Sequence, residues 1–101
     1  MIATSLQGVV RHLDELSDEL LIYVPADREV ADGDTPVLLL AEEEDEHGDA
    51  PDGWRYLLEL FIVRDVLETW SAWRGGRMPT VQEACQAIVH YAFHDAYLPV
   101  E

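Results

Sequence analysis

The last third of the chain carries the pattern that constrains its fold most, because two apolar stripes at helical spacing stand on either side of a helix stop. The first stripe consists of Val63, Val66, Leu67 and Trp70. Gly75 and Gly76 follow it, and glycine at this place ends a helix as a C-terminal cap does. The pattern therefore predicts a helix up to about residue 73, with Trp70 in the core.

The second stripe begins at a strong helix-start signal. Thr80 and Glu83 have the spacing of a capping box, in which each side chain bonds the backbone N–H of the other residue. The apolar stripe that follows consists of Val81, Ala84, Cys85, Ile88, Tyr91 and Ala92. Cys85 is the only cysteine, so it forms no internal disulfide, and its place on the stripe predicts a core residue.

Short apolar runs ahead of these helices predict strands. Residues 20–24 end at Pro25, and residues 37–41 form a second run. Their separation is too long for a tight hairpin, and antiparallel pairing is the simplest arrangement. In residues 54–61, Tyr56 and Leu58 share one face with Leu60 at period two, which favours a third strand and leaves a helix open.

A further helix is expected near the start of the chain. Thr4 or Ser5 can cap it, and its apolar residues are Leu6, Val9, Val10 and Leu13. Acidic residues then crowd positions 14–19, and a helix C-terminus disfavours anions, so we expect the helix to end near residue 16 or 17. The fold class is α+β: a single compact domain over 1–101 with one N-terminal helix, two to three antiparallel strands and two C-terminal helices.

The charge of the chain limits its partners. Twenty-one Asp and Glu face six basic residues, which gives a net charge of -15. Such a field repels nucleic-acid phosphates and anionic lipid and attracts basic proteins. We therefore expect no direct binding to nucleic acid or membrane. Two interpretations remain open: the charge keeps the chain soluble, or it selects a basic protein partner.

The acidic residues are unevenly distributed, and seven of them lie between positions 42 and 52. We interpret residues 42–53 as a solvated acidic loop and a docking surface, with Trp54 at its edge as an interface anchor because tryptophan is enriched at binding hot spots. Ordinary packing is the alternative for Trp54. The predicted partner-binding residues are Asp32, Asp34, Glu42, Glu43, Glu44, Asp45, Glu46, Asp49, Asp52 and Trp54.

Signals of catalysis are weak. His90 and His94 have a spacing that can place two imidazoles on one metal, but no glutamate follows His90 and no third ligand is evident. The acids around Gly33 do not follow the ligand order of a calcium loop. We expect a chain that is not an enzyme and has no metal or cofactor. A metal-dependent enzyme built on His90, His94 and Asp95 is a weaker alternative.

The first five residues lack the basic start and apolar stretch of a signal peptide. No apolar run reaches the ~20 residues that a membrane-spanning helix needs. We therefore expect a cytoplasmic protein.

The order of features resembles a family of small acidic uncharacterised bacterial domains. The resemblance rests on LIYVP at 21–25, VRDV at 63–66, and YAFHDAY at 91–97, a tyrosine-rich helix end followed by Asp-Ala-aromatic. Some members resemble immunity proteins, which are inhibitors encoded beside polymorphic toxins. The chain departs from the pattern at His90, His94 and residues 71–78. The resemblance implies no catalytic residues.

The leading hypothesis is an immunity-like inhibitory protein whose acidic surface covers a basic site on a toxin or a nucleic-acid-binding enzyme. The alternative is a phage- or plasmid-borne mimic of nucleic acid, of the anti-restriction or anti-CRISPR type, that blocks such an enzyme. Partner identity and oligomeric state stay open at this point.

Overall fold

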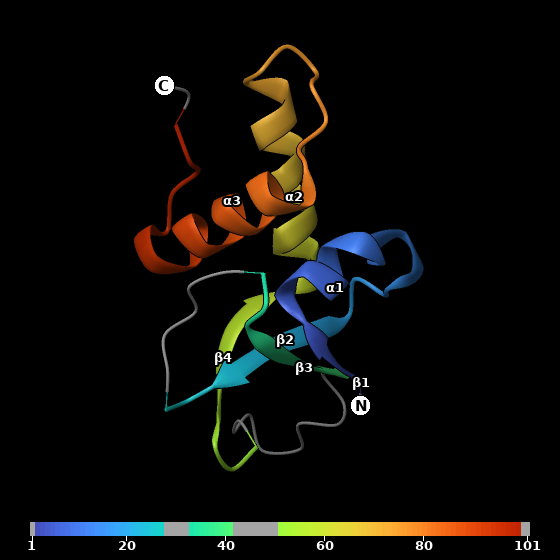
Figure 1. Cartoon of the computed structure of the whole chain (residues 1–101), viewed down its shortest axis with the longest axis vertical. Coiled ribbons are helices and arrows are strands. Elements are labelled where there is room, and N and C mark those ends of the chain that lie inside the picture. Colours follow the sequence, from blue (N-terminus) through green and yellow to red (C-terminus); the bar gives the residue numbers. More distant parts are fainter. Residues whose placement is uncertain (1, 28–32, 42–50, 100–101) are drawn as a thin grey trace.

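The described residues of the computed structural model, 2–27, 33–41 and 51–99, form an α+β domain (Figure 1). Its elements in chain order are β1 (Ile2–Ser5), α1 (Leu6–Arg11), the short 3-10 helix η1 (Leu13–Glu15), β2 (Leu20–Pro25), β3 (Pro36–Ala41), β4 (Trp54–Glu59), α2 (Leu60–Ala72) and α3 (Val81–His94). The predicted fold class and the two C-terminal helices are confirmed. None of the helices in these residues has the length and apolar character needed to cross a membrane.

The sheet has four strands within the described residues, in the order β1-β3-β2-β4, and every pair is antiparallel. The prediction of two to three strands was wrong because it missed β1. This strand spans only four residues, too few to show an alternating pattern. Ser5 ends β1 and at the same time caps α1, since Gly8 N–H donates to Ser5 Oγ at 3.2 Å. The predicted cap is confirmed.

The first helix is shorter than expected. α1 ends at Arg11, and after His12 the chain continues as η1 to Glu15. Helical structure therefore stops close to the predicted position, but its last turn is the tighter 3-10 type that is common at helix ends.

A β-bulge in β4 changes which residues face the core. Ile22 pairs with Leu58 and Tyr23 pairs with Tyr56, which leaves Leu57 as an extra residue. Leu57 and Leu58 are consequently both buried in the core, while Tyr56 is 46% exposed. The prediction that Tyr56 and Leu58 share a face was wrong for this reason. β4 ends at Glu59, and α2 begins at the next residue.

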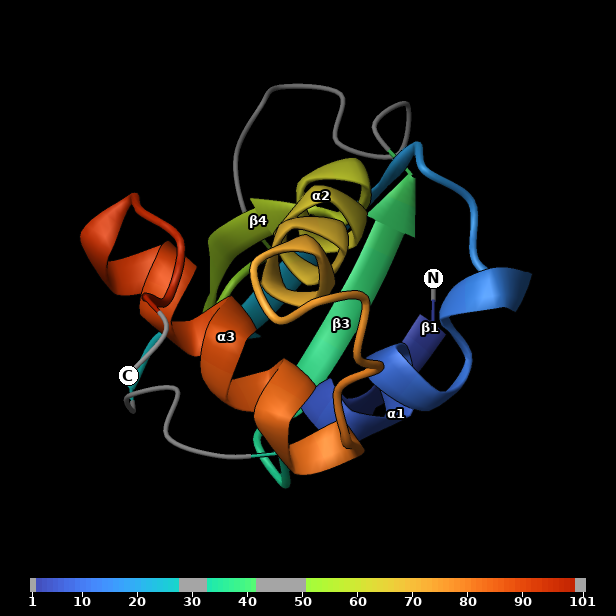
Figure 2. The same cartoon turned by 90° about the horizontal axis from the view of Figure 1, so that it is seen from above.

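The main core lies between the helices and one face of the sheet. Figures 1 and 2 place α2 and α3 on the same side of the sheet, where they cross each other. The core consists of Leu6, Val9, Ile22, Val24, Val37, Leu39, Leu57, Leu58, Leu60, Val63, Cys85 and Ile88. The predicted burial of Cys85 and Trp70 is confirmed. A smaller cluster of Tyr23, Leu38 and Leu40 occupies the opposite face of the sheet.

The far end of α2 extends away from the sheet. In Figure 1 this end and the connection from α2 to α3 rise above the other elements. α2 ends at Ala72, and both Gly75 and Gly76 have positive φ, so the predicted glycine stop is confirmed. The connection then returns to the start of α3, which lies beside α1. A hollow lies between α1, α2 and this connection.

Replacing Ile88 with Ala should lower the free energy of unfolding by about 2–5 kcal/mol, because Ile88 is fully buried and its truncation leaves a cavity. Urea denaturation measures the change. The matched control is Gln86→Ala on the exposed side of the same helix, which should change stability by no more than about 0.5 kcal/mol. Equal effects of the two substitutions would contradict the assigned core.

Candidate protein-binding face

A hollow of about 650 Å³ lies where α1 and η1, α2 and the α2–α3 connection meet. We call it the α1–α2 hollow. Its apolar lining residues are Val10, Leu13, Leu67, Ala72, Met78, Pro79, Val81 and Ala84. Charged side chains from two of the walls also border it: Arg11 and Asp14 from the α1 side, and Arg64 and Glu68 from α2. An apolar hollow with charged borders is the general form of a binding site.

The α1 wall is fixed to the sheet by its first turn. Leu6 N–H donates to Thr35 O at 3.0 Å, and Gln7 N–H donates to Gly33 O at 2.9 Å. Leu6 and Val9 are fully buried against the sheet. Because these residues occupy the inner face of the helix, Val10 is left beside the hollow, where it is only partly buried.

Arg64 joins the α1 wall to α2. Its Nη2 donates to Leu13 O at 2.7 Å and also to Leu16 O, and its Nε is paired with Asp18 Oδ1. One guanidinium therefore satisfies two backbone carbonyls of the segment that follows α1 and one carboxylate. Arginine suits this task because it presents several donors in a fixed planar arrangement.

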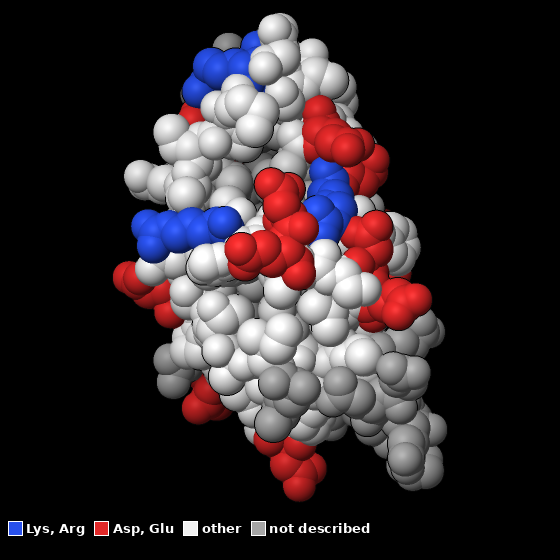
Figure 3. Space-filling model, turned by 90° about the vertical axis from the view of Figure 1, so that its right-hand side faces the viewer, with Lys and Arg blue, Asp and Glu red and all other residues white. Residues whose placement is uncertain are grey.

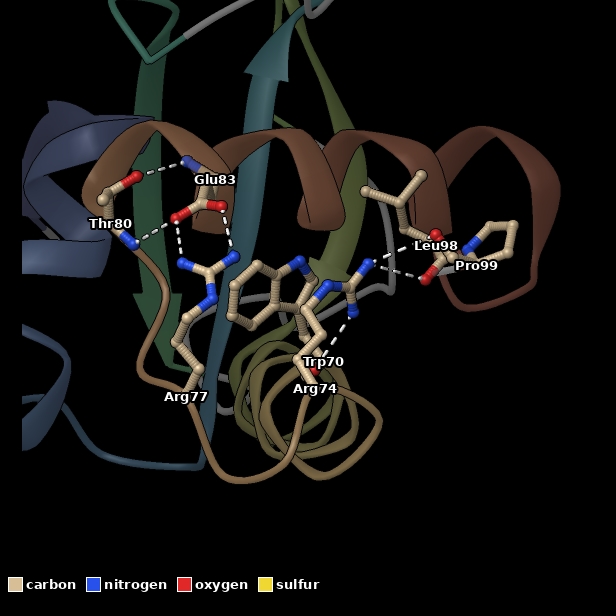
Figure 4. A network of polar contacts seen from close by, with 7 residues as sticks. All are labelled: Trp70, Arg74, Arg77, Thr80, Glu83, Leu98 and Pro99. Carbon is tan, nitrogen blue, oxygen red and sulfur yellow. Dashed lines mark hydrogen bonds and ion pairs between the residues drawn. The ribbon is translucent and has the colours of Figure 1, made fainter. Parts of the chain in front are cut away.

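The α2–α3 connection forms the third wall, and two arginines hold it on Trp70 (Figure 4). The Arg74 and Arg77 guanidinium carbons lie 4.3 Å and 4.7 Å from the centroid of the buried Trp70 ring, both in cation–π positions. Arg74 also donates to Trp70 O at 3.0 Å and to Pro99 O at 3.2 Å. These contacts position Met78, whose side chain is 79% exposed at the border of the hollow.

Arg77 ties the same connection to the start of α3. Its two terminal nitrogens donate to the two carboxylate oxygens of Glu83 at 3.1 and 2.8 Å. Glu83 also accepts from Thr80 N–H at 3.0 Å, and Thr80 Oγ1 accepts from Glu83 N–H at 3.1 Å, which confirms the predicted capping box. The bonds from Arg77 and Thr80 stabilise the charged carboxylate and lower the pKa of Glu83 to about 2.

Four exposed carboxylates surround Arg64, and we call them the acidic patch: Asp14, Asp18, Asp65 and Glu68. Asp14 and Glu68 border the α1–α2 hollow. The other two border a second, smaller hollow of about 390 Å³, which Arg64 and Glu68 also line. In Figure 3, which views the molecule from the α1 side, acidic side chains gather on this face around a basic one. Since Arg64 is already paired, the patch presents a net negative surface.

Asp65 is positioned by the segment after α3. Tyr97 donates its phenol hydrogen to Asp65 Oδ2, which raises the pKa of Tyr97 because the neutral phenol is the donor. The Tyr97 ring in turn packs edge-on against Trp73, with centroids 5.8 Å apart, and lies tilted against Tyr91, with centroids 5.4 Å apart. The position of Asp65 therefore depends on the packing of three aromatic rings, Tyr91, Tyr97 and Trp73.

Three members of the predicted docking surface, Asp34, Asp52 and Trp54, lie within the described residues. Asp34 is exposed on the helix side of the molecule, where Gln7 Nε2 donates to its Oδ1 at 3.0 Å. Asp52 is exposed in the turn before β4, and Trp54 is half-buried against the cluster on the opposite face of the sheet. This packing agrees with the alternative interpretation of Trp54, and its role as an interface anchor stays a prediction. Asp32, Glu42, Glu43, Glu44, Asp45, Glu46 and Asp49 lie outside the described residues.

The histidine pair on α3 has close rings, with the centroids of His90 and His94 4.5 Å apart. In the part of the chain that the structure describes, no group of three His, Cys, Asp or Glu side chains is placed to hold a metal ion. The calcium-loop candidates around Gly33 lie partly outside the described residues.

Sequence reasoning missed the acidic patch. In the sequence, the acids at 14–19 indicate the end of a helix, and no motif assigns a role to Asp65 or Glu68. The usable signal was the spacing of Arg64 and Glu68, which are four positions apart. Residues at this spacing lie on the same surface of a helix, so the pair predicts a charged helix surface.

Comparison of the chain with protein-family models, with curated proteins and with solved structures gives no match.

Acid should weaken the bond between Arg77 and Glu83. The pKa of Glu83 is about 2 in the folded chain and 4.5 ordinarily, so this pair stabilises the fold above pH 4.5, and its contribution is lost as the pH falls toward 2. Glu83→Gln and Arg77→Met both remove the pair. Urea denaturation at a series of pH values should therefore show a stability difference between the chain and either variant that shrinks over this interval. A difference independent of pH would contradict the assignment.

Proposed function

We propose that the chain is a non-catalytic inhibitory protein of the immunity type, acting in the cytoplasm, that docks the acidic patch on a basic site of a partner protein. The single observation that carries the proposal is the arrangement of four exposed carboxylates around one paired arginine, beside an apolar hollow. Protein interfaces commonly combine an apolar centre with a charged border.

Long-range electrostatics favour the same kind of partner. The net charge of -15 attracts a basic protein from a distance and speeds association at low salt. The sites at which toxins and nucleic-acid-binding enzymes hold phosphates are basic, so a carboxylate surface is complementary to them. In this proposal the chain covers such a site and performs no chemistry.

The rigidity of the face supports inhibition by occlusion. Arg64 fixes the segment that carries Asp14 and Asp18 on α2, and Tyr97 holds Asp65. Carboxylates that are already positioned lose less conformational entropy on binding, which favours affinity. The acidic loop at 42–53 stays a predicted second contact surface.

The test uses the protein encoded directly upstream of this chain as the partner, with association rates measured at low and high salt. Asp14→Asn combined with Glu68→Gln should slow association at low salt by about three- to tenfold, because charges at the border of an interface act mainly on the association rate. Arg11→Gln should speed it, since this change makes the same face more negative. The matched control, Asp95→Asn at the end of α3, should leave the rate unchanged.

A second arm compares the two acidic surfaces. Replacing Glu42, Glu43, Glu44 and Glu46 with Gln removes charge from the loop and leaves the acidic patch intact. A complex that is insensitive to salt and to the variants of the patch would overturn the proposal for this face. An effect of the loop variant alone would transfer the docking surface to residues 42–46.

A further inference from the structure

We infer that the α1–α2 hollow receives a large apolar side chain of a basic partner segment, while arginine or lysine side chains of the same segment bind the acidic patch. This inference rests on the proposed function and deepens it, because it names the chemistry of the partner. Two members of the acidic patch, Asp14 and Glu68, also border the hollow, so one segment can contact both.

The apolar half of the inference comes from the lining. Leu67 and Val81 are only partly buried, and Met78 is among the most exposed large apolar side chains that the structure describes. Exposed apolar surface bordered by charged groups marks interaction sites on soluble proteins. Methionine adapts its shape to a ligand, which suits it to the border of such a site. At about 650 Å³ the hollow has room for a large side chain.

The basic half comes from charge complementarity. Arg64 is paired with Asp18 and donates to two backbone carbonyls. Asp14 and Glu68 border the hollow beside this guanidinium, and both can bind cations of a partner. Arg11 is the other basic residue at the border, on the α1 side. Cations of the partner are therefore expected over the α2 side, away from Arg11.

Charge also selects among possible occupants. A second copy of this chain would bring another net charge of -15 to the same place, and an anionic metabolite would meet the same repulsion. A purely apolar segment would leave the carboxylates at the border without partners. A segment that is both basic and apolar satisfies the hollow and the patch together.

The test titrates the isotope-labelled chain with a synthetic amphipathic helical peptide of leucine and arginine. A matched peptide carries the same arginines with every leucine replaced by serine. We expect the leucine peptide to shift the NMR signals of Leu67, Met78 and Ala84, and to bind about tenfold more tightly than the serine peptide, because apolar anchors carry much of the affinity of an interface.

Variants of the chain show whether the hollow is responsible. Ala72→Trp fills the border of the hollow from an exposed position, and Met78→Ala removes an exposed apolar contact. Each should bring the affinity for the leucine peptide close to that for the serine peptide. Ala96→Trp is the control, since Ala96 is exposed and does not border the hollow.

The outcomes separate the inference from the proposed function. Equal binding of both peptides, unaffected by Ala72→Trp, would overturn the inference and leave docking by charge intact. Shifts at the opposite face of the sheet instead of the hollow would also overturn it. Failure of both peptides to bind at low salt would count against the inference and against the proposed function together.

Discussion

The guanidinium of Arg64 holds together the face of this protein that carries the α1–α2 hollow and the acidic patch. Arg64 reaches from α2 to the carbonyls of Leu13 and Leu16 and to the Asp18 carboxylate. Without it, the carbonyls of Leu13 and Leu16 would lose this charged donor, and the acids of that segment would lose the cation that offsets their repulsion. The same bonds close one side of the α1–α2 hollow. The contacts of Arg64 thus set one side of the hollow and hold the segment that carries Asp14 and Asp18.

The opposite side of the hollow depends on a second arginine network. Trp70 lies beneath Arg74 and Arg77, and Arg77 continues to Glu83 at the start of α3 (Figure 4). Three of the six basic residues therefore serve internal contacts, as Arg64, Arg74 and Arg77. Arg64 and Arg77 pair with carboxylates, and Arg74 and Arg77 lie over the Trp70 ring. The net charge itself follows from the 21 acidic and six basic residues of the composition.

Much of the fold follows from periodicity and from helix-end signals. The helices, three of the strands and the capping box of α3 follow from local patterns. β1 could not be predicted because four residues show no period, and the bulge at Leu57 could not be predicted because it depends on pairing with β2. The acidic patch depends on tertiary contact: Asp18 and Arg64 are 46 positions apart in the chain. A charge count therefore pointed to the loop at 42–52, where the acids are adjacent in sequence.

We expect the partner to cover the face formed by α1, η1 and α2. Hydrogen exchange of the chain, measured alone and in complex with the protein encoded upstream of it, tests this expectation, because exchange reports which backbone amides a partner protects. We predict slower exchange at residues 11–19 and at the α2–α3 connection, residues 73–80, with β4 unchanged. Protection confined to residues 42–52, with no change at 11–19, would contradict it.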